Sequence, residues 1–264
     1  MQQAKASMYV SPTQLMVISP NLVADVHQHV VIQFTCSLDG TPFSVWTEKD
    51  GWQRAEAVLI NSNVAHSVKD FEGWQVTLCM IPDARKGRRI QEKLLQGGDI
   101  RYYLAKDIAP ILSVLEEARQ QFLPDSKAFH SLTDTIYNYL VGNADFDPPL
   151  DERITRALLY IRQHIHESIS AAALAAEVHL SEHRFLHLFK EQVGAPLRQY
   201  VLWIRLAAGI QAFVEGRSAK EAAYEAGFSD PAHFSRTFQQ LFGGQPSMYA
   251  AIKTFYHIAF FEDF

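Results

Sequence analysis

The sequence predicts an α+β protein built from a strand-rich N-terminal domain and an all-α C-terminal domain. Three observations lead to this fold class. Residues 14–81 contain short runs of Val, Ile, Phe, Thr and Trp, divided by turn signals such as "DGTP" and "KDG". From about residue 88 the apolar residues recur at helical spacing, and from 153 to 253 this spacing is continuous. Between the two regions, "VGNADFDPPLDE" at 141–152 interrupts any regular structure with Gly, Asn and Pro.

These observations divide the chain into a first domain at 1–141, a linker at 142–152 and a second domain at 153–264. A length of 264 residues suits two domains that each bury a core. No apolar run approaches the ~20 residues that span a bilayer, so we expect no membrane partner. The N-terminus lacks the features of a signal peptide, which predicts a reducing cytoplasm and makes Cys36 and Cys79 small core residues.

Charge is distributed unequally along the chain. Residues 153–253 hold 11 Lys and Arg against 8 Asp and Glu, a net charge of +3, whereas residues 1–152 hold 13 against 19, a net charge of −6. The C-terminal part is therefore the relatively basic one, which points weakly to an anionic partner.

In the first domain, the strands are followed by helices predicted at roughly 88–97, 106–121 and 126–141. The second of these helices carries an apolar stripe, which makes it the candidate contact of a homodimer. Such a stripe also suits an internal core. The stripe consists of Ile108, Ile111, Leu112 and Leu115.

An internal repeat is the most informative feature of the second domain. "AAALAAEVHLSEHRFLHLFKEQVG" at 171–194 recurs as "AKEAAYEAGFSDPAHFSRTFQQLFG" at 219–243, with one residue inserted after Ser229. Each copy predicts a short Ala-rich helix, a tight turn, a Ser that caps the next helix, and a second helix with buried Phe residues. Two helices joined in this way form a helix-turn-helix, whose second helix fits the major groove of DNA.

The two predicted turns differ in one residue. Gly227 supplies a left-handed backbone conformation in the second copy, and His179 takes its place in the first. A side chain at such a position costs about 1 kcal/mol, so the first turn is expected to be the more strained.

A long predicted helix with Leu197, Val201, Ile204 and Ala208 on one side connects the two copies. It would hold the two second helices at a fixed separation, which is about 34 Å if both enter successive major grooves.

The outward faces of these second helices carry the candidate DNA-binding residues. Histidines can bond base edges, Leu186 can pack on a thymine methyl group, and Lys190 is placed for a phosphate. Arg236 is the leading candidate, because its guanidinium can bind guanine O6 and N7 together. Solvated side chains without a partner are the alternative interpretation. The candidates are His183, Leu186, His187 and Lys190 in the first copy, and Ala232, His233, Arg236 and Gln240 in the second.

The second domain resembles the double helix-turn-helix of the AraC/XylS transcription regulators over about 165–252. The resemblance is carried by "SEHRFLHLFKEQVGAPLRQYV" and "SAKEAAYEAGFSDPAHFSRTFQQLFGGQPSMY". His179 and His187 depart from the usual pattern. The resemblance implies a homodimeric regulator that binds double-stranded DNA, responds to a small-molecule effector and activates transcription together with RNA polymerase.

"HQHVVIQFTCSLDG" at 27–40 resembles the first metal-binding motif of cupin β-barrels, with Gln33 in the place of the usual Glu. His66 matches the histidine of the second cupin motif. The resemblance implies a cupin-like barrel as the sensory and dimerisation domain. Even spacing also puts His27, His29 and Gln33 on one face of an extended chain.

These four residues, His27, His29, Gln33 and His66, are the predicted effector-binding site. Because the charged ligand is lost, we expect a metal-free pocket, and therefore no metal and no cofactor. A bound divalent ion and purely structural histidines are the alternatives.

A basic cluster in "PDARKGRR" is an alternative site for an anionic ligand such as a nucleotide second messenger. A solvated loop is the favoured interpretation of it. The cluster consists of Arg85, Lys86, Arg88 and Arg89.

The sequence thus predicts a transcription regulator and not an enzyme. A metal-dependent cupin enzyme, or a second-messenger sensor, with a DNA-binding domain attached is the competing hypothesis, and Gln33 argues against the enzyme.

Overall fold

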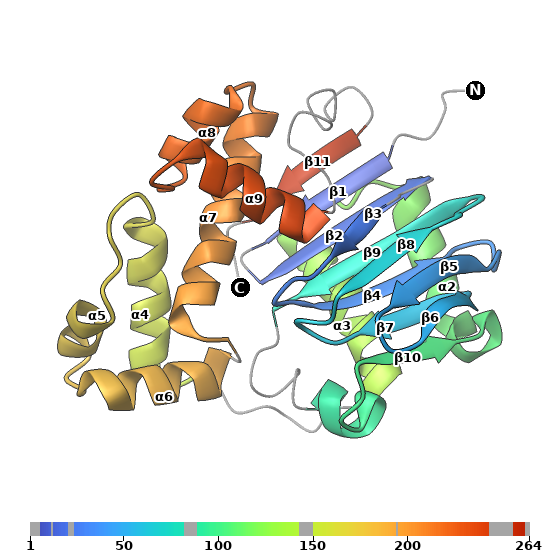
Figure 1. The fold of residues 1–264 in the computed structure, drawn as a ribbon, viewed down its shortest axis with the longest axis horizontal. Helices are drawn as coiled ribbons and strands as arrows, with labels where there is room; N and C mark the ends of the chain where they lie inside the picture. The colour runs from blue at the N-terminus through green and yellow to red at the C-terminus, as the bar shows by residue number, and fades with distance from the viewer. Residues whose placement is uncertain are drawn as a thin grey trace. The chain divides into compact units, whose positions relative to one another are not determined.

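The computed structural model describes residues 6–11, 13–20, 24–81, 89–142, 150–193, 195–242 and 256–261 (Figure 1). They divide into two compact units. The first contains the strands, the helices that follow them and the C-terminal strand, and the second contains the helices from residue 150 to residue 238. Most of the predicted linker, 143–149, lies outside the described residues.

The strands of the first unit form two sheets, in which strand order differs from sequence order. The predicted cupin-like barrel is therefore realised as two layered sheets and not as one closed cylinder. The larger sheet has the order β10-β7-β4-β9-β2-β1-β11, with β1 (Ala6–Val10), β2 (Gln14–Pro20), β4 (Ile32–Ser37), β7 (Ala57–Ile60), β9 (Trp74–Met80), β10 (Ile100–Tyr103) and β11 (Tyr256–Phe260). The smaller sheet has the order β3-β8-β5-β6, with β3 (Ala24–His27), β5 (Phe43–Thr47), β6 (Gly51–Ala55) and β8 (His66–Lys69).

Each face of the larger sheet contributes to a different core. Successive side chains on a strand point to opposite faces. On β7, Ala57 and Leu59 belong to the main core with the helices, while Val58 and Ile60 belong to a smaller core with residues of the second sheet. The smaller core therefore lies between the two sheets.

Two α-helices and one short π-helix lie within the predicted helical stretches. They are η1 (Gln91–Leu95), α2 (Ala105–Gln120) and α3 (Ser126–Val141). Asp125 caps α3, because its carboxylate accepts a hydrogen bond of 2.8 Å from the backbone N–H of Ala128.

The apolar stripe of α2 lies inside the first unit. Ile108, Ile111 and Leu115 are at most 1% exposed and belong to the main core, and Leu112 packs against that core. The prediction that this stripe forms a dimer contact is therefore wrong, because the main core already covers it.

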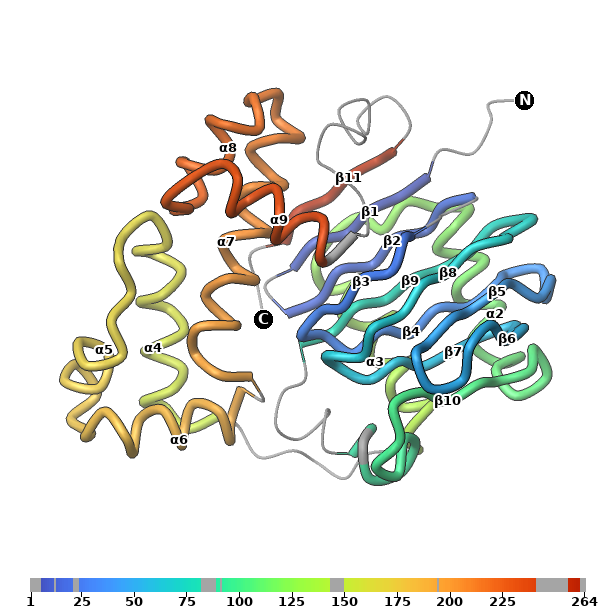
Figure 2. The backbone as a smooth tube through the Cα atoms, in the orientation of Figure 1, coloured from blue at the N-terminus to red at the C-terminus, as the bar shows by residue number. Residues whose placement is uncertain are grey.

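The C-terminal strand β11 pairs in parallel with β1, from Ala6 opposite Tyr256 to Val10 opposite Phe260 (Figures 1 and 2). The ring of Phe261 then packs at 5.4 Å from that of Phe129. The described part of the C-terminal tail therefore completes an edge of the larger sheet.

The second unit is helical throughout and contains the predicted pair of helix-turn-helix motifs (Figure 2). Helix α7 connects them. The helices of the second unit are α4 (Glu152–Gln163), α5 (Ala171–Glu177), α6 (Glu182–Val193), α7 (Leu197–Val214), α8 (Ala219–Glu225) and α9 (Pro231–Phe242). Phe185, Phe189, Phe234 and Phe238 are buried, which confirms the predicted inner faces of the second helices.

The caps of the two second helices differ. In the first copy the Ser181 hydroxyl accepts from the backbone N–H of Arg184 at 3.4 Å, as predicted. In the second copy Asp230 replaces Ser229 in this role, because its carboxylate accepts from the backbone N–H of His233 at 2.8 Å. The residue inserted after Ser229 moves the cap one position along the chain.

Both turns use the left-handed backbone conformation that was predicted for them. His179 has a φ of 54° and Gly227 a φ of 79°.

Candidate functional site

The two second helices expose the side chains that the sequence assigns to DNA. On α6, His183, Leu186, His187 and Lys190 are all exposed, and on α9 the same holds for Ala232, Arg236 and Gln240. His233 is half-buried, with its ring edge against that of Phe228 at 5.3 Å. The structure therefore brings the candidates of each helix to one accessible face, with His233 at its margin.

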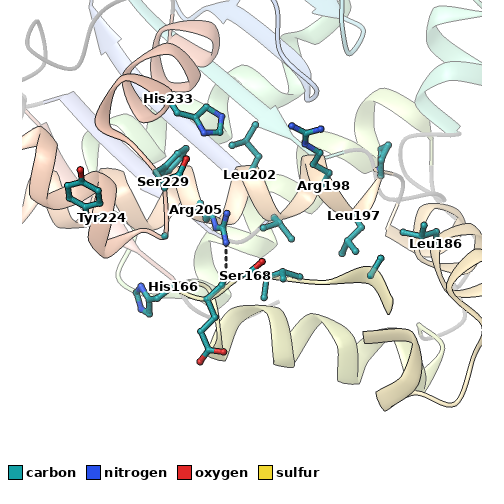
Figure 3. A pocket seen from close by; sticks show the side chains of 17 residues that line it. His166, Ser168, Leu186, Leu197, Arg198, Leu202, Arg205, Tyr224, Ser229 and His233 are labelled. Carbon is teal, nitrogen blue, oxygen red and sulfur yellow. Dashed lines mark hydrogen bonds between the residues drawn. The ribbon is translucent and has the colours of Figure 1, made fainter. Parts of the chain in front are cut away.

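A hollow of about 990 Å³ lies among the helices of the second unit (Figure 3). Leu186 of α6 and His233 of α9 both line it, so it adjoins both candidate DNA-binding faces. Arg198 and Arg205 of α7 also line it.

The two arginines of the hollow have different roles. Arg205 donates to the carbonyl of Ile165 at 3.2 Å and to that of Glu167 at 2.6 Å, which fixes the start of the α4–α5 connection. Arg198 is exposed. The sequence analysis did not select Arg198, because it treated the connecting helix only as a spacer. A basic residue on the polar side of that helix could have indicated a further DNA contact.

The predicted sensory residues converge in the first unit. His27 ends β3, His66 begins β8 directly opposite it, and Gln33 lies on β4 of the other sheet. His29 lies in the connection between β3 and β4. One nitrogen of each histidine lies within 4.8 Å of the others, so these residues bridge the two sheets. The convergence was predicted, although it arises from two sheets and a connection and not from one strand.

Each of the three histidine rings has its Nδ1 held by a backbone carbonyl. The partners are Asp25 for His27 at 2.7 Å, Val31 for His29 at 3.1 Å and Val64 for His66 at 2.8 Å. A carbonyl only accepts, so each Nδ1 carries a proton and a neutral ring keeps its lone pair on Nε2.

Burial favours the neutral form of these rings. His29 is 7% exposed and His66 is fully buried. Burial, together with the neighbouring His27, lowers the pKa of His29 to about 4 and holds the pKa of His66 well below its ordinary value. The pKa of His27 is also lowered, mainly by burial.

Gln33 is the polar partner shared by two of the rings. Its Oε1 position lies 2.8 Å from Nε2 of His29 and 3.3 Å from Nε2 of His66. Its other amide atom bonds the Thr35 hydroxyl at 3.0 Å, which bonds Thr77 at 3.1 Å. With neutral rings, the amide satisfies both Nε2 atoms when its NH2 group is turned toward them, and Thr35 then donates to the amide oxygen.

The three clustered histidines could also hold a divalent ion. Metal-bound histidines donate their other ring N–H to a carbonyl or carboxylate, which is the arrangement found here. Because the three nitrogens lie within 4.8 Å of one another, an ion at their centre would lie at most about 2.8 Å from each of them, compared with Zn–N distances of about 2.0–2.1 Å. His27, His29 and His66 are thus the residues that could hold a metal.

The basic cluster contributes little to the described structure. Arg85, Lys86 and Arg88 lie outside the described residues, and Arg89 is half-buried. Cys36 and Cys79 are buried free thiols, as predicted, and burial raises the pKa of each to about 12.

Comparison with known proteins identifies the second unit. A family model described as a helix-turn-helix domain matches residues 174–252. The probable transcriptional regulator LumQ of Photobacterium leiognathi is 29% identical over 72% of this chain and 77% of its own length. The arabinose operon regulatory protein of Escherichia coli is 31% identical over 41% of this chain and 38% of its own. The chain carries an AraC-type DNA-binding domain. It is a DNA-binding transcription regulator of this type.

The fold of this AraC-type regulator matches a solved structure over most of the chain. ToxT from Vibrio cholerae has a TM-score of 0.53 at 14% identity, covering 90% of this chain and 98% of that one. Another structure of ToxT is described as bound to an unsaturated fatty acid. In the parts of the AraC-type regulator that the structure describes, no helix is both long and apolar enough to cross a membrane.

Proposed function

We propose that this regulator is switched by a small molecule that binds beside His27, His29, Gln33 and His66. The observation that carries the proposal is the convergence of three neutral imidazoles and one amide between two sheets. A few polar groups converging among apolar residues are typical of a small-molecule site. On this proposal the protein is a cytoplasmic homodimer that activates transcription with RNA polymerase and catalyses no reaction.

Binding must favour one state of the protein if it is to change transcription. A ligand shifts an equilibrium only by the difference between its affinities for the two states. The effector is therefore expected to change the affinity of the full chain for its operator, and an operator duplex selected from a random library serves to measure this change.

Replacing both His29 and His66 with Ala is expected to abolish the effector response, because the variant lacks two of the converging rings. DNA affinity without effector should stay at the wild-type value, since the DNA-binding residues lie in the second unit. A transcription reporter measures the response, and a thermal melt checks that the variant is folded. A folded double variant that still responds fully would contradict the site assignment.

Arg236→Ala is expected to cost about 1–3 kcal/mol of operator binding, because a guanidinium bonded to guanine O6 and N7 is lost. The loss should depend on the base pair that Arg236 reads. Affinities for a set of duplexes, each with one base pair changed, measure this dependence. An equal loss on every duplex would reassign Arg236 to a phosphate.

Arg198→Ala provides the comparison for that experiment. A side chain in the hollow between two DNA-binding faces is placed for the phosphates that lie between successive major grooves. We therefore expect Arg198→Ala to weaken binding equally on all duplexes and to lower the slope of log K against log salt by about 1. Arg156, exposed on α4 and not among the residues that line the hollow, is the control position.

Metal-dependent sensing is a second candidate function, favoured by the three carbonyl-fixed Nδ1 atoms. Metal analysis of the purified full chain separates the two candidates. One equivalent of a divalent ion that is lost in the His29 and His66 double variant, and retained when exposed His183 and His187 are replaced instead, would support it. A metal-free protein that still responds to its effector would rule out metal-dependent sensing.

A further inference from the structure

The two helix-turn-helix motifs of the second unit meet at few places. Helix α5 packs on α6, and α8 packs on the connecting helix α7. Among the described residues, no comparable packing joins α5 or α6 to α8 or α9. The separation of the two motifs therefore depends on α7 and on the contacts that attach each motif to it.

The second motif is attached directly to α7. A Cβ at Gly209 of this helix would lie 2.6 Å from the ring of Phe234 on α9 and 3.3 Å from the Cβ of Ala226, which follows α8. The helices can approach this closely because Gly209 has no side chain. The second motif thus has little freedom to move relative to α7.

The first motif is attached to α7 at two points. The ring of Phe189 on α6 lies edge-on at 5.6 Å from that of Tyr200, near the start of α7. Further along α7, the guanidinium of Arg205 donates to the carbonyl of Ile165 at 3.2 Å and to that of Glu167 at 2.6 Å. Both carbonyls belong to the connection between α4 and α5, which leads into the first motif. A second attachment point prevents the rotation that a single one would allow.

The turn of the second motif approaches the same carbonyl (Figure 3). A Cβ at Gly227 would lie 2.3 Å from the backbone oxygen of Ile165 and 3.1 Å from Nε of Arg205. The connection into the first motif, the helix between the motifs and the turn of the second motif therefore meet at one carbonyl and one guanidinium.

We infer that Arg205 is a positioning residue that fixes the separation and relative rotation of α6 and α9, and so makes the regulator selective for the spacing between the two DNA segments that these helices contact. The inference rests on the proposed DNA contacts of α6 and α9, and it is independent of the sensory site. Arg205 itself is assigned no DNA contact, because its Nε and one Nη already bind backbone carbonyls.

The geometry of B-DNA makes this spacing a strong constraint. A full turn takes about 34–36 Å and about 10–10.5 base pairs. One base pair inserted between the two contacted segments therefore moves the second segment by about 3.4 Å and rotates it by about 35°. A rigid pair of motifs then loses the contacts of one motif, whereas a loosely joined pair can follow the displaced segment.

Arg205→Met tests this selectivity, because methionine keeps an apolar stem and removes the donors. The full chain is titrated with the selected operator and with the same operator carrying one inserted base pair between the segments that α6 and α9 contact. We expect the insertion to weaken wild-type binding about 100-fold and Arg205→Met binding about tenfold or less, because each lost bond to a charged donor is worth about tenfold or more. An equal penalty in both proteins would overturn the inference.

Arg198→Met is the matched control. Arg198 lies on the same helix and lines the same hollow, but it is exposed and is bonded to neither carbonyl. Its loss should weaken binding to both duplexes by the same factor. Arg205→Lys keeps a cation with a single donor nitrogen and should lie between the wild type and Arg205→Met. Thermal melts check that the variants are folded, and Arg205→Lys carries the test if Arg205→Met is not. A spacing penalty lowered as much by Arg198→Met would contradict the assignment to Arg205.

A distance measurement without DNA separates this inference from the proposed DNA contacts. Spin labels at His187→Cys on α6 and Ala232→Cys on α9 report the separation of the helices, since both positions are exposed and the native thiols are buried. Excess unlabelled protein restricts the signal to distances within one chain. We expect a narrow distribution that broadens with Arg205→Met, and an unchanged distribution would overturn the inference. A broadened distribution, with a wild type that tolerates the inserted base pair, would show that Arg205 fixes the separation and that the proposed DNA contacts are wrong.

Discussion

Leu115→Glu is expected to unfold the first unit, at a cost of about 5 kcal/mol or more. Leu115 is 0% exposed in the main core, where it packs with residues of the larger sheet and of α3. The substitution removes a buried apolar side chain and places a carboxylate where no cation pairs with it among the core residues described. Circular dichroism and thermal melting of the purified variant measure the loss of structure.

Ser113→Glu is the control for charge and helix propensity. Ser113 is exposed on the same helix α2, so the same new carboxylate stays in water. Its effect should lie within about 0.5 kcal/mol of zero. A folded, monomeric Leu115→Glu protein would instead restore α2 as a dimer contact.

This contrast shows what helical periodicity can and cannot predict. The spacing of Ile108, Ile111 and Leu115 predicted the helix and its apolar side, and both predictions are confirmed. Periodicity does not say whether that side meets its own chain or a second copy. The answer depended on the larger sheet, whose strand order no local pattern encodes.

The second unit was more predictable, because its information is local. The repeat gave both helix-turn-helix motifs, the buried phenylalanines and the two left-handed turns. The cap of α9 was missed, since one inserted residue made Asp230 the acceptor in place of Ser229. A cap depends on the backbone position at which the helix begins, and a shift of one residue changes the side chain that reaches it.

The sensory site could be predicted in part from the sequence. Even spacing suggested that His27, His29 and Gln33 share a face, and they do meet. The backbone carbonyls that fix each ring could not be predicted, because they depend on backbone conformation at and around His29. The lack of a hydrogen-bond partner for the buried amide of Gln75 could not be predicted either, because the sequence shows only a glutamine on a predicted strand.

Gly227→Ala is expected to destabilise the second unit by about 2–4 kcal/mol and to weaken operator binding accordingly. Two effects combine. A φ of 79° costs any L side chain about 1 kcal/mol. In addition, a Cβ at this position would lie 2.3 Å from the backbone oxygen of Ile165, so the backbone itself must move. That oxygen accepts from Arg205, and its displacement also weakens this bond.

Gly51→Ala separates these two effects. Gly51 has a φ of 65°, but a Cβ there would meet nothing within 4 Å, so only the conformational cost of about 1 kcal/mol is expected. His179→Gly tests the same conformational cost in the equivalent turn of the first motif, where relief of the strain at φ 54° should offset much of the added chain entropy. Urea denaturation of the three variants measures the differences. If Gly227→Ala lowers the free energy of unfolding no more than Gly51→Ala does, the Ile165 carbonyl moves aside at little cost. The close approach between the second turn and the end of α4 would then not hold the two motifs together.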